Sequence, residues 1–269
     1  MRKRQIALWF CLYAMAMVLL EPAWGAEPIF QHKTLTHWLK AYANAKPDSQ
    51  AEKNCRTAIL AIGTDAVPTL VDMVASNDVR RQQLAANVFG ILGPLGAPAI
   101  PALTNLLVGT NAVATVFAAD SLGAIGVLAL PALMNTLTNQ NYNAAALAAL
   151  ALASLGTNAT PAVPIFLQDL QNGDRSVRER AAGALGNLHL QPEVVVPALT
   201  NMLAERSVTA RCLALGSLAK FQGSARLAVP VILPLLQDPE ATVRLSATNA
   251  LNEIDAELLK PRPAPALAE

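Results

Sequence analysis

Six prolines recur along this chain at an almost constant interval, and each opens an apolar segment. The interval is 33 residues, with one shorter step of 30, and the prolines are Pro68, Pro101, Pro131, Pro164, Pro197 and Pro230. Proline is favoured in the first turn of a helix, because the backbone N–H that it lacks would have no acceptor within the helix there. A repeat of this period predicts a stack of helical units, each buried mainly by its neighbours, and not a single globular core.

A second periodic pattern describes the interior of each unit. The residue seventeen positions after every proline is alanine: Ala85, Ala118, Ala148, Ala181, Ala214 and Ala247. Larger apolar side chains follow at twenty-one and twenty-four positions, which completes the i, i+4, i+7 stripe of an amphipathic helix. We therefore predict an all-α unit with a first helix, a turn and a longer second helix, and no strand. The small alanine side chains predict close contact between stacked helices.

The two flanks of the array differ from the repeats. Residues 26–62 lack the opening proline and carry more charge, which predicts an N-terminal capping helical pair. Residues 63–257 hold six repeats. Residues 258–269 are rich in proline and are predicted to be a disordered tail.

The first 25 residues have the order of a bacterial signal peptide. Arg2, Lys3 and Arg4 precede an uncharged apolar run, and small residues lie before a possible cleavage point at Ala26. We expect a periplasmic or secreted protein, with an uncleaved N-terminal anchor as the alternative. Without residues 1–25 the formal net charge falls from +1 to −1. No later segment is expected to be long and apolar enough to span a membrane.

The repeat resembles a known family. The unit is most complete as PAVPIFLQDLQNGDRSVRERAAGALGNL, residues 161–188, and this pattern is similar to HEAT repeats, especially the bacterial phycobilisome-lyase-type HEAT-like form. The resemblance implies a right-handed α-solenoid of stacked helix pairs, about seven units long, that binds protein partners on its concave surface. The family's arginine, fourteen positions after the proline, is matched by Arg178, Arg211 and Arg244, whereas Gln82, Thr115 and Ala145 depart from the pattern.

Those three arginines have two interpretations. They could form a structural ladder that connects the two helices of each unit, or an anion-binding stripe, and we favour the ladder. A nucleic-acid partner would need a basic face, which a nearly neutral chain does not predict.

Motifs for catalysis or metal binding are absent from the sequence. His32 and His37 are five residues apart, off the spacing that directs two ligands at one metal, and Cys55 and Cys212 are predicted to be separate thiols. We therefore predict no enzyme activity, no catalytic residue, no metal and no cofactor.

The exposed face of the second helices is the best candidate for partner binding. Its predicted residues are Arg80, Asn87, Phe117, Asp120, Asn143, Leu147, Glu179, Arg180, Asn187 and Lys220. A specific version places a peptide across Phe117 and Leu147, with Glu179 or Arg180 at its end. The predicted function is an exported, monomeric, non-catalytic scaffold for a protein or peptide partner. The alternatives are a lyase-like or chaperone module that acts on a cofactor-bearing protein, and a structural spacer in the cell envelope.

Overall fold

The fold is described from a computed structural model, which covers residues 27–137 and 141–256. The predicted signal peptide (1–25) and tail (258–269) lie outside the described residues.

The described residues form seven helix pairs. The first helices are α2 (Leu35–Asn44), α4 (Val67–Ala75), α6 (Ile100–Leu107), α8 (Leu130–Leu137), α10 (Val163–Asp169), α12 (Pro192–Asn201) and α14 (Val229–Ile232). The second helices are α3 (Gln50–Ile62), α5 (Val79–Leu92), α7 (Ala112–Ile125), α9 (Tyr142–Ala153), α11 (Arg175–Leu188), α13 (Val208–Lys220) and α15 (Ala241–Ile254). Short 3₁₀ turns connect them: η1 (Gly63–Ala66), η2 (Gly93–Ala99), η3 (Val127–Ala129), η4 (Gly156–Ala162), η5 (Met202–Ala204), η6 (Gln222–Ala228) and η7 (Leu233–Gln237).

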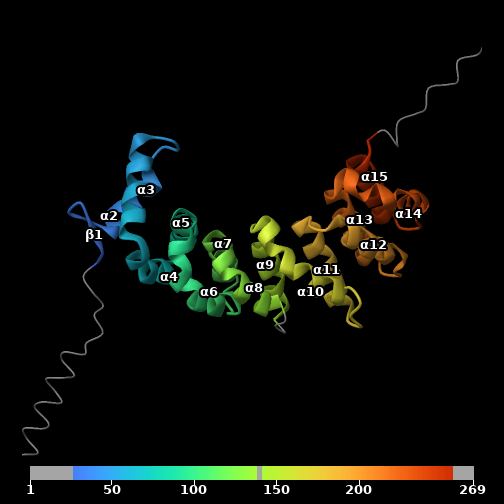
Figure 1. Ribbon diagram of the computed structural model, residues 1–269, viewed down its shortest axis with the longest axis horizontal. Coiled ribbons are helices and arrows are strands. Elements are labelled where there is room, and N and C mark those ends of the chain that lie inside the picture. Colours follow the sequence, from blue (N-terminus) through green and yellow to red (C-terminus); the bar gives the residue numbers. More distant parts are fainter. Residues whose placement is uncertain (1–26, 138–140, 257–269) are drawn as a thin grey trace, which may run out of the picture.

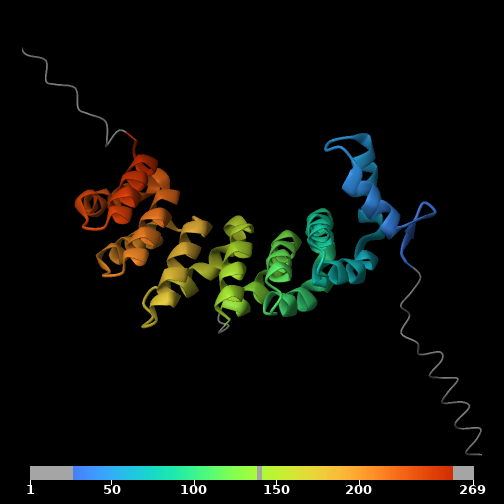
Figure 2. The same cartoon turned by 180° about the vertical axis from the view of Figure 1, so that it is seen from behind.

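The pairs stack side by side into an arc. Figure 1 shows α4, α6, α8 and α10 along the outer edge, with α5, α7, α9 and α11 along the inner edge. The view from behind shows the same two layers (Figure 2). Each second helix packs on the second helices of adjacent units as well as on its own partner. The predicted all-α solenoid of about seven units is confirmed.

The start of each second helix is encoded ten positions after the repeat proline. Asp78, Asn111, Asn141, Asp174 and Ser207 are N-caps whose side-chain oxygens accept backbone N–H groups of the first turn. Such caps satisfy donors that have no partner within the helix, and each contributes about 1 kcal/mol. The sixth position, Glu240, makes no side-chain cap.

The ends of the second helices require left-handed backbone. Glycines occupy this place after α3, α5 and α7 and in the turn after α9, with φ between 51° and 90° at Gly63, Gly93, Gly126 and Gly156. His189 after α11 (φ 52°) and Gln222 after α13 (φ 47°) adopt the same region without being glycine. Glycine therefore provides this conformation in the first three repeats, and other residues provide it later.

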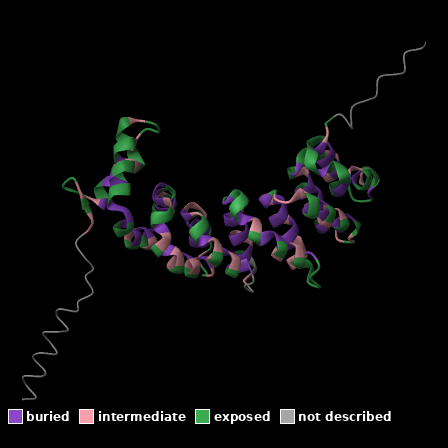
Figure 3. Cartoon of the chain, in the orientation of Figure 1, coloured by how far each residue is buried: buried purple, intermediate pink, exposed green. Residues whose placement is uncertain are grey.

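The periodic stripe forms the core. All six repeat alanines have 0% exposure, and so do the residues four positions later: Phe89, Leu122, Leu152, Leu185, Leu218 and Leu251. Because the alanines are small, the backbones of adjacent second helices can approach closely. Burial follows the interfaces between units, and exposed residues dominate α3 at one end and make up half of α14 at the other (Figure 3).

Two expectations are wrong. A two-residue hairpin, β1 (Ile29–Phe30) and β2 (Lys33–Thr34), precedes α2, because Gln31 and His32 both adopt positive φ and form a tight turn. Among the described residues, two helical runs, 50–75 and 79–107, are long and apolar enough to cross a membrane by length and composition. Half of the apolar window of the first run, and 44% of that of the second, is buried within the array.

Candidate partner-binding surface

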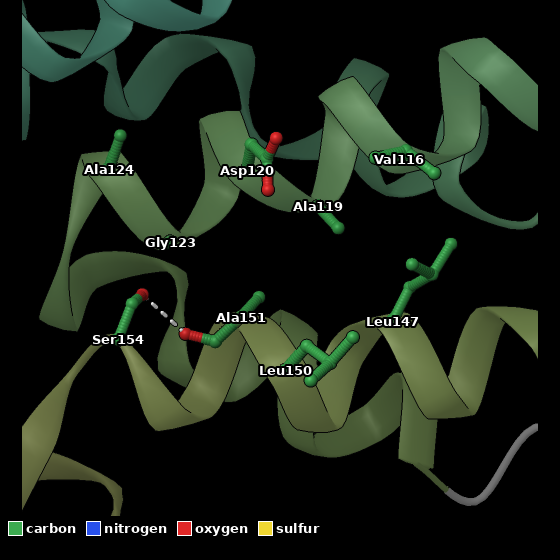
Figure 4. A pocket seen from close by; sticks show the side chains of 9 residues that line it. All are labelled: Val116, Ala119, Asp120, Gly123, Ala124, Leu147, Leu150, Ala151 and Ser154. Carbon is green, nitrogen blue, oxygen red and sulfur yellow. Dashed lines mark hydrogen bonds between the residues drawn. The ribbon is translucent and has the colours of Figure 1, made fainter. Parts of the chain in front are cut away.

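A groove opens between α7 and α9 on the inner face of the arc. Its volume is about 440 Å³, and both helices contribute side chains to it (Figure 4). The lining residues are Val116, Ala119, Asp120, Gly123, Ala124, Leu147, Leu150, Ala151 and Ser154. Val116 and Leu150 are 41% and 53% exposed, which is high for large apolar side chains in a packed array.

Small residues set the separation of these two helices. A Cβ atom on Gly123 would lie 2.6 Å from Ser154 Oγ, so α7 and α9 are in tight contact there. The Ser154 hydroxyl donates to the Ala151 carbonyl at 2.7 Å, so its polarity is satisfied within α9 (Figure 4). Larger side chains, Val116 on α7 and Leu147 on α9, border the groove beyond this contact.

Asp120 is the charged group of the groove. Between Arg81 and Asp169 the sequence contains no other charged residue. Desolvation by the surrounding apolar side chains raises the pKa of the Asp120 carboxyl above its ordinary value. No described residue forms an ion pair with Asp120. The groove is thus an apolar channel with one carboxylate on its wall.

A second hollow of about 530 Å³ lies where α2 and α3 meet α5. Arg80 and Asn87 both line it, together with Tyr42 and Leu84. The Gln83 side-chain amide donates to Asn87 Oδ1 at 3.0 Å. Two of the predicted partner-binding residues therefore lie together here, away from the α7–α9 groove.

Four other predicted residues are occupied by contacts within the array. Glu179 accepts from Arg175 at 2.6 Å and from Ser207 at 3.0 Å. Arg180 is paired with Asp169 at 3.6 Å, and its side chain is only 10% exposed. Lys220 donates to Asn187 in the adjacent unit. These side chains join neighbouring elements of the C-terminal half.

The proposed patch of Phe117, Leu147 and Arg180 is not formed. Phe117 is 9% exposed and belongs to the core, because its position on α7 faces the neighbouring helices. Leu147 and Asp120 do line one groove, whereas Asn143 is exposed on α9 but does not line it. Sequence reasoning missed Val116, Leu150 and Ser154, although they occupy positions fifteen, nineteen and twenty-three after the repeat proline, on the candidate face.

The arginine series links consecutive units. Arg178 donates to both carboxylate oxygens of Glu205, at 2.9 and 3.0 Å, and to the Asn172 and Gly173 carbonyls. Arg211 repeats the arrangement with Asp238 and with the carbonyls of Glu205 and Arg206. Arg244 donates to the carbonyls of Asp238 and Pro239. Each arginine spans the turn of its own unit, and the first two reach an acid in the next, as a structural ladder does.

Amide side chains provide part of this function where the arginine is missing. Gln82 donates to the Val74 and Ser76 carbonyls at 3.1 and 2.6 Å. Asn111 donates to Asn77 and Asn141 to the Val108 carbonyl, each across a unit boundary. In the sequence, Asn111 and Asn141 are marked by their N-cap positions, whereas Gln82 occupies the position of the family's arginine.

Groups that could bind a metal do not cluster among the described residues. Cys55 is buried and Cys212 is half-buried, and both are free thiols. Desolvation raises the pKa of the Cys55 thiol, so a smaller fraction of it is ionised to the reactive thiolate.

A family model described as HEAT repeats matches residues 130–211 and 163–252. This part of the chain consists of HEAT repeats. No curated protein matches it in sequence. Among solved structures, the complex of CpcE and CpcF of phycocyanin lyase from Nostoc sp. PCC7120 is similar, with 24% identity over 57% of this chain and 98% of that chain and a TM-score of 0.50. A designed armadillo repeat protein in complex with the peptide (KR)4 shows 15% identity over 83% of this chain and 100% of that chain, with a TM-score of 0.46.

Proposed function

We propose that this HEAT-repeat protein is an exported, monomeric, non-catalytic scaffold that binds a segment of a protein partner in the α7–α9 groove. The observation that carries the proposal is the groove itself, an apolar channel with exposed Val116 and Leu150 on opposite walls. Four polar side chains in the C-terminal half of the same face, Glu179, Arg180, Asn187 and Lys220, are engaged within the array. An extended or helical segment that covers the groove would remove this apolar surface from water, which favours binding by about 25 cal/mol for each Å² buried.

A pair of leucines provides the test of this proposal. Leu150 is 53% exposed in the groove, and Leu128 is 51% exposed in η3, outside the groove lining. A displayed peptide library is selected on the immobilised protein, and the selected peptides are then measured against Leu150→Gln and Leu128→Gln. We expect Leu150→Gln to weaken binding by at least about tenfold, since it places an unpaired amide against apolar groups, and Leu128→Gln to bind normally. Equal binding by the two variants, or selection of no peptide, contradicts the proposal.

Export is supported by residues 1–25 alone, whose charged start and apolar run have the order of a signal peptide. N-terminal sequencing of the protein recovered from a bacterial periplasmic fraction should begin at Ala26. Replacement of Leu19 and Leu20 by arginine should leave the protein in the cytoplasmic fraction, because the apolar run is then interrupted. A periplasmic protein that begins at Met1 would instead indicate the uncleaved anchor.

A lyase-like role is the second candidate, and the likeness to a complex of phycocyanin lyase is the observation that favours it. The groove lining contains no aromatic, histidine or cysteine side chain, and Asp120 is its one ionisable group. A single carboxylate offers no paired acid and base for transfer chemistry. This chemistry favours the scaffold over a catalyst.

A further inference from the structure

We infer that the α7–α9 groove selects partner segments that carry a lysine or arginine, with Asp120 as the acceptor of the cationic group. This inference rests on the proposed function and specifies the partner's chemistry. Asp120 places a carboxylate in a part of the chain that otherwise lacks charge.

Asp120 is isolated from the other charged residues of the chain. The nearest charged residues in the sequence are Arg81 and Asp169, so two whole units and parts of two others are neutral apart from this side chain. Neither α7 nor α9 carries a basic residue. In the C-terminal half, by contrast, Glu205 and Asp238 each accept from an arginine of the array. Asp120 has no such partner among the described residues, so an incoming cation would be its counter-charge.

The side chains around Asp120 in the groove are mostly apolar. Figure 4 shows its carboxylate projecting from α7 beside the gap that Leu147, Leu150 and Ala151 border from α9. Asp120 is an exposed residue, but its apolar neighbours partly desolvate the carboxylate and raise its pKa. A cation that binds there gains more than it would at a fully hydrated carboxylate.

The shape of the lining decides between a small cation and a long side chain. Lysine and arginine carry aliphatic stems that pack on apolar surface while their charged ends reach a polar group. Val116, Leu147 and Leu150 provide that surface next to Asp120. A partner that presents such a side chain can pack its aliphatic stem on the apolar walls and pair its charged end with the carboxylate.

The test uses arrays of synthetic nonapeptides with random small and aliphatic flanks and a fixed central residue. The central residue is lysine, arginine, or one of their neutral counterparts, acetyl-lysine and citrulline. We expect the full chain to bind the charged arrays about tenfold more tightly than the neutral ones, as one partly desolvated ion pair would give. Asp120→Asn should lose this discrimination and keep the weaker, neutral-level binding.

Two variants separate the possible failures. Asp72→Asn makes the same chemical change at an exposed site on α4 and should retain the discrimination. Asp120→Asn should unfold at the same or a higher temperature than the wild type, since it removes an uncompensated charge, so misfolding would not explain its loss of discrimination.

Binding without any preference for charge overturns this inference and leaves the proposed function intact, as does discrimination that persists in Asp120→Asn. Binding of no array overturns both. Competition by a free polyamine at concentrations comparable to the peptides would show that the site takes a small cation, and it would overturn the inference of a partner side chain.

Discussion

At the scale of single residues, a tight contact between two units requires a glycine. Gly186 on α11 faces Ser217 on α13, and a Cβ atom on Gly186 would lie 2.6 Å from Ser217 Cβ and 2.8 Å from its Cα. The Ser217 hydroxyl donates to the Ala182 carbonyl at 2.8 Å across the same contact. Since the second of these atoms is backbone, a side-chain rotation cannot relieve the clash.

Gly186→Ala should therefore lower the free energy of unfolding by about 1–3 kcal/mol, the usual cost of overpacking. Gly183→Ala lies on the same helix, where an added Cβ atom would meet nothing within 4 Å, and it should raise the free energy of unfolding by up to about 1 kcal/mol through helix propensity. Urea denaturation of both variants checks the pair. A Gly186→Ala variant as stable as Gly183→Ala would show that α11 and α13 can separate freely at this contact.

At the scale of elements, the arginine ladder replaces part of the packing that a globular core would supply. Arg178 lies at the start of α11, and its partner Glu205 lies in the turn before α13, so one side chain fixes the relative position of two units. The hydrogen bonds from Arg178 lower the pKa of Glu205 below its ordinary value. A lowered carboxyl pKa means that the folded state is stabilised when the group is ionised.

Glu205→Gln should lower the free energy of unfolding by about 1 kcal/mol at neutral pH, because the pair is bidentate and partly buried. The stabilising contribution is present above the unfolded-state pKa and is lost as the pH falls through the lowered pKa of the folded state. The difference between wild type and variant should thus shrink in acid, as measured by urea denaturation over a series of pH values. Glu253→Gln, an exposed site, should show little difference at any pH, and a pH-independent loss at Glu205 would indicate packing as the cause.

The elements were largely predictable from the sequence, and the groove between α7 and α9 was not. Repeat prolines and alanines mark every helix pair after the first, because each unit buries the same residue types at the same positions. The groove depends on which of several exposed positions face a neighbour across a gap. Phe117 is buried and Val116 beside it is exposed, and one residue of helical rotation separates these outcomes. The periodic pattern shows which side of a helix is apolar, but this stripe is wide, so the pattern does not show which residue at its border is buried.

At the scale of the whole molecule, the array divides into differently connected parts. α13 is held to its neighbours by Ser217, by Arg211 and by the contact between Lys220 and Asn187. At the centre, Thr115 and Ala145 occupy the ladder position and provide no arginine. Because each unit contacts only its neighbours, a boundary with fewer side-chain contacts lowers the stability of the adjacent units only.

Amide hydrogen exchange should reveal this division. In a uniform array the ends open first and the middle is best protected, but here we expect α9, in the central unit, to exchange faster than α13, which is nearer the C-terminal end. The comparison uses rates corrected for the intrinsic exchange of each sequence, since α9 is rich in alanine. Protection that decreases evenly from the centre to both ends would contradict it. A bound lysine-containing peptide should slow exchange in α7 and α9 and leave α13 unchanged, because the groove lies between two units that no ladder arginine joins.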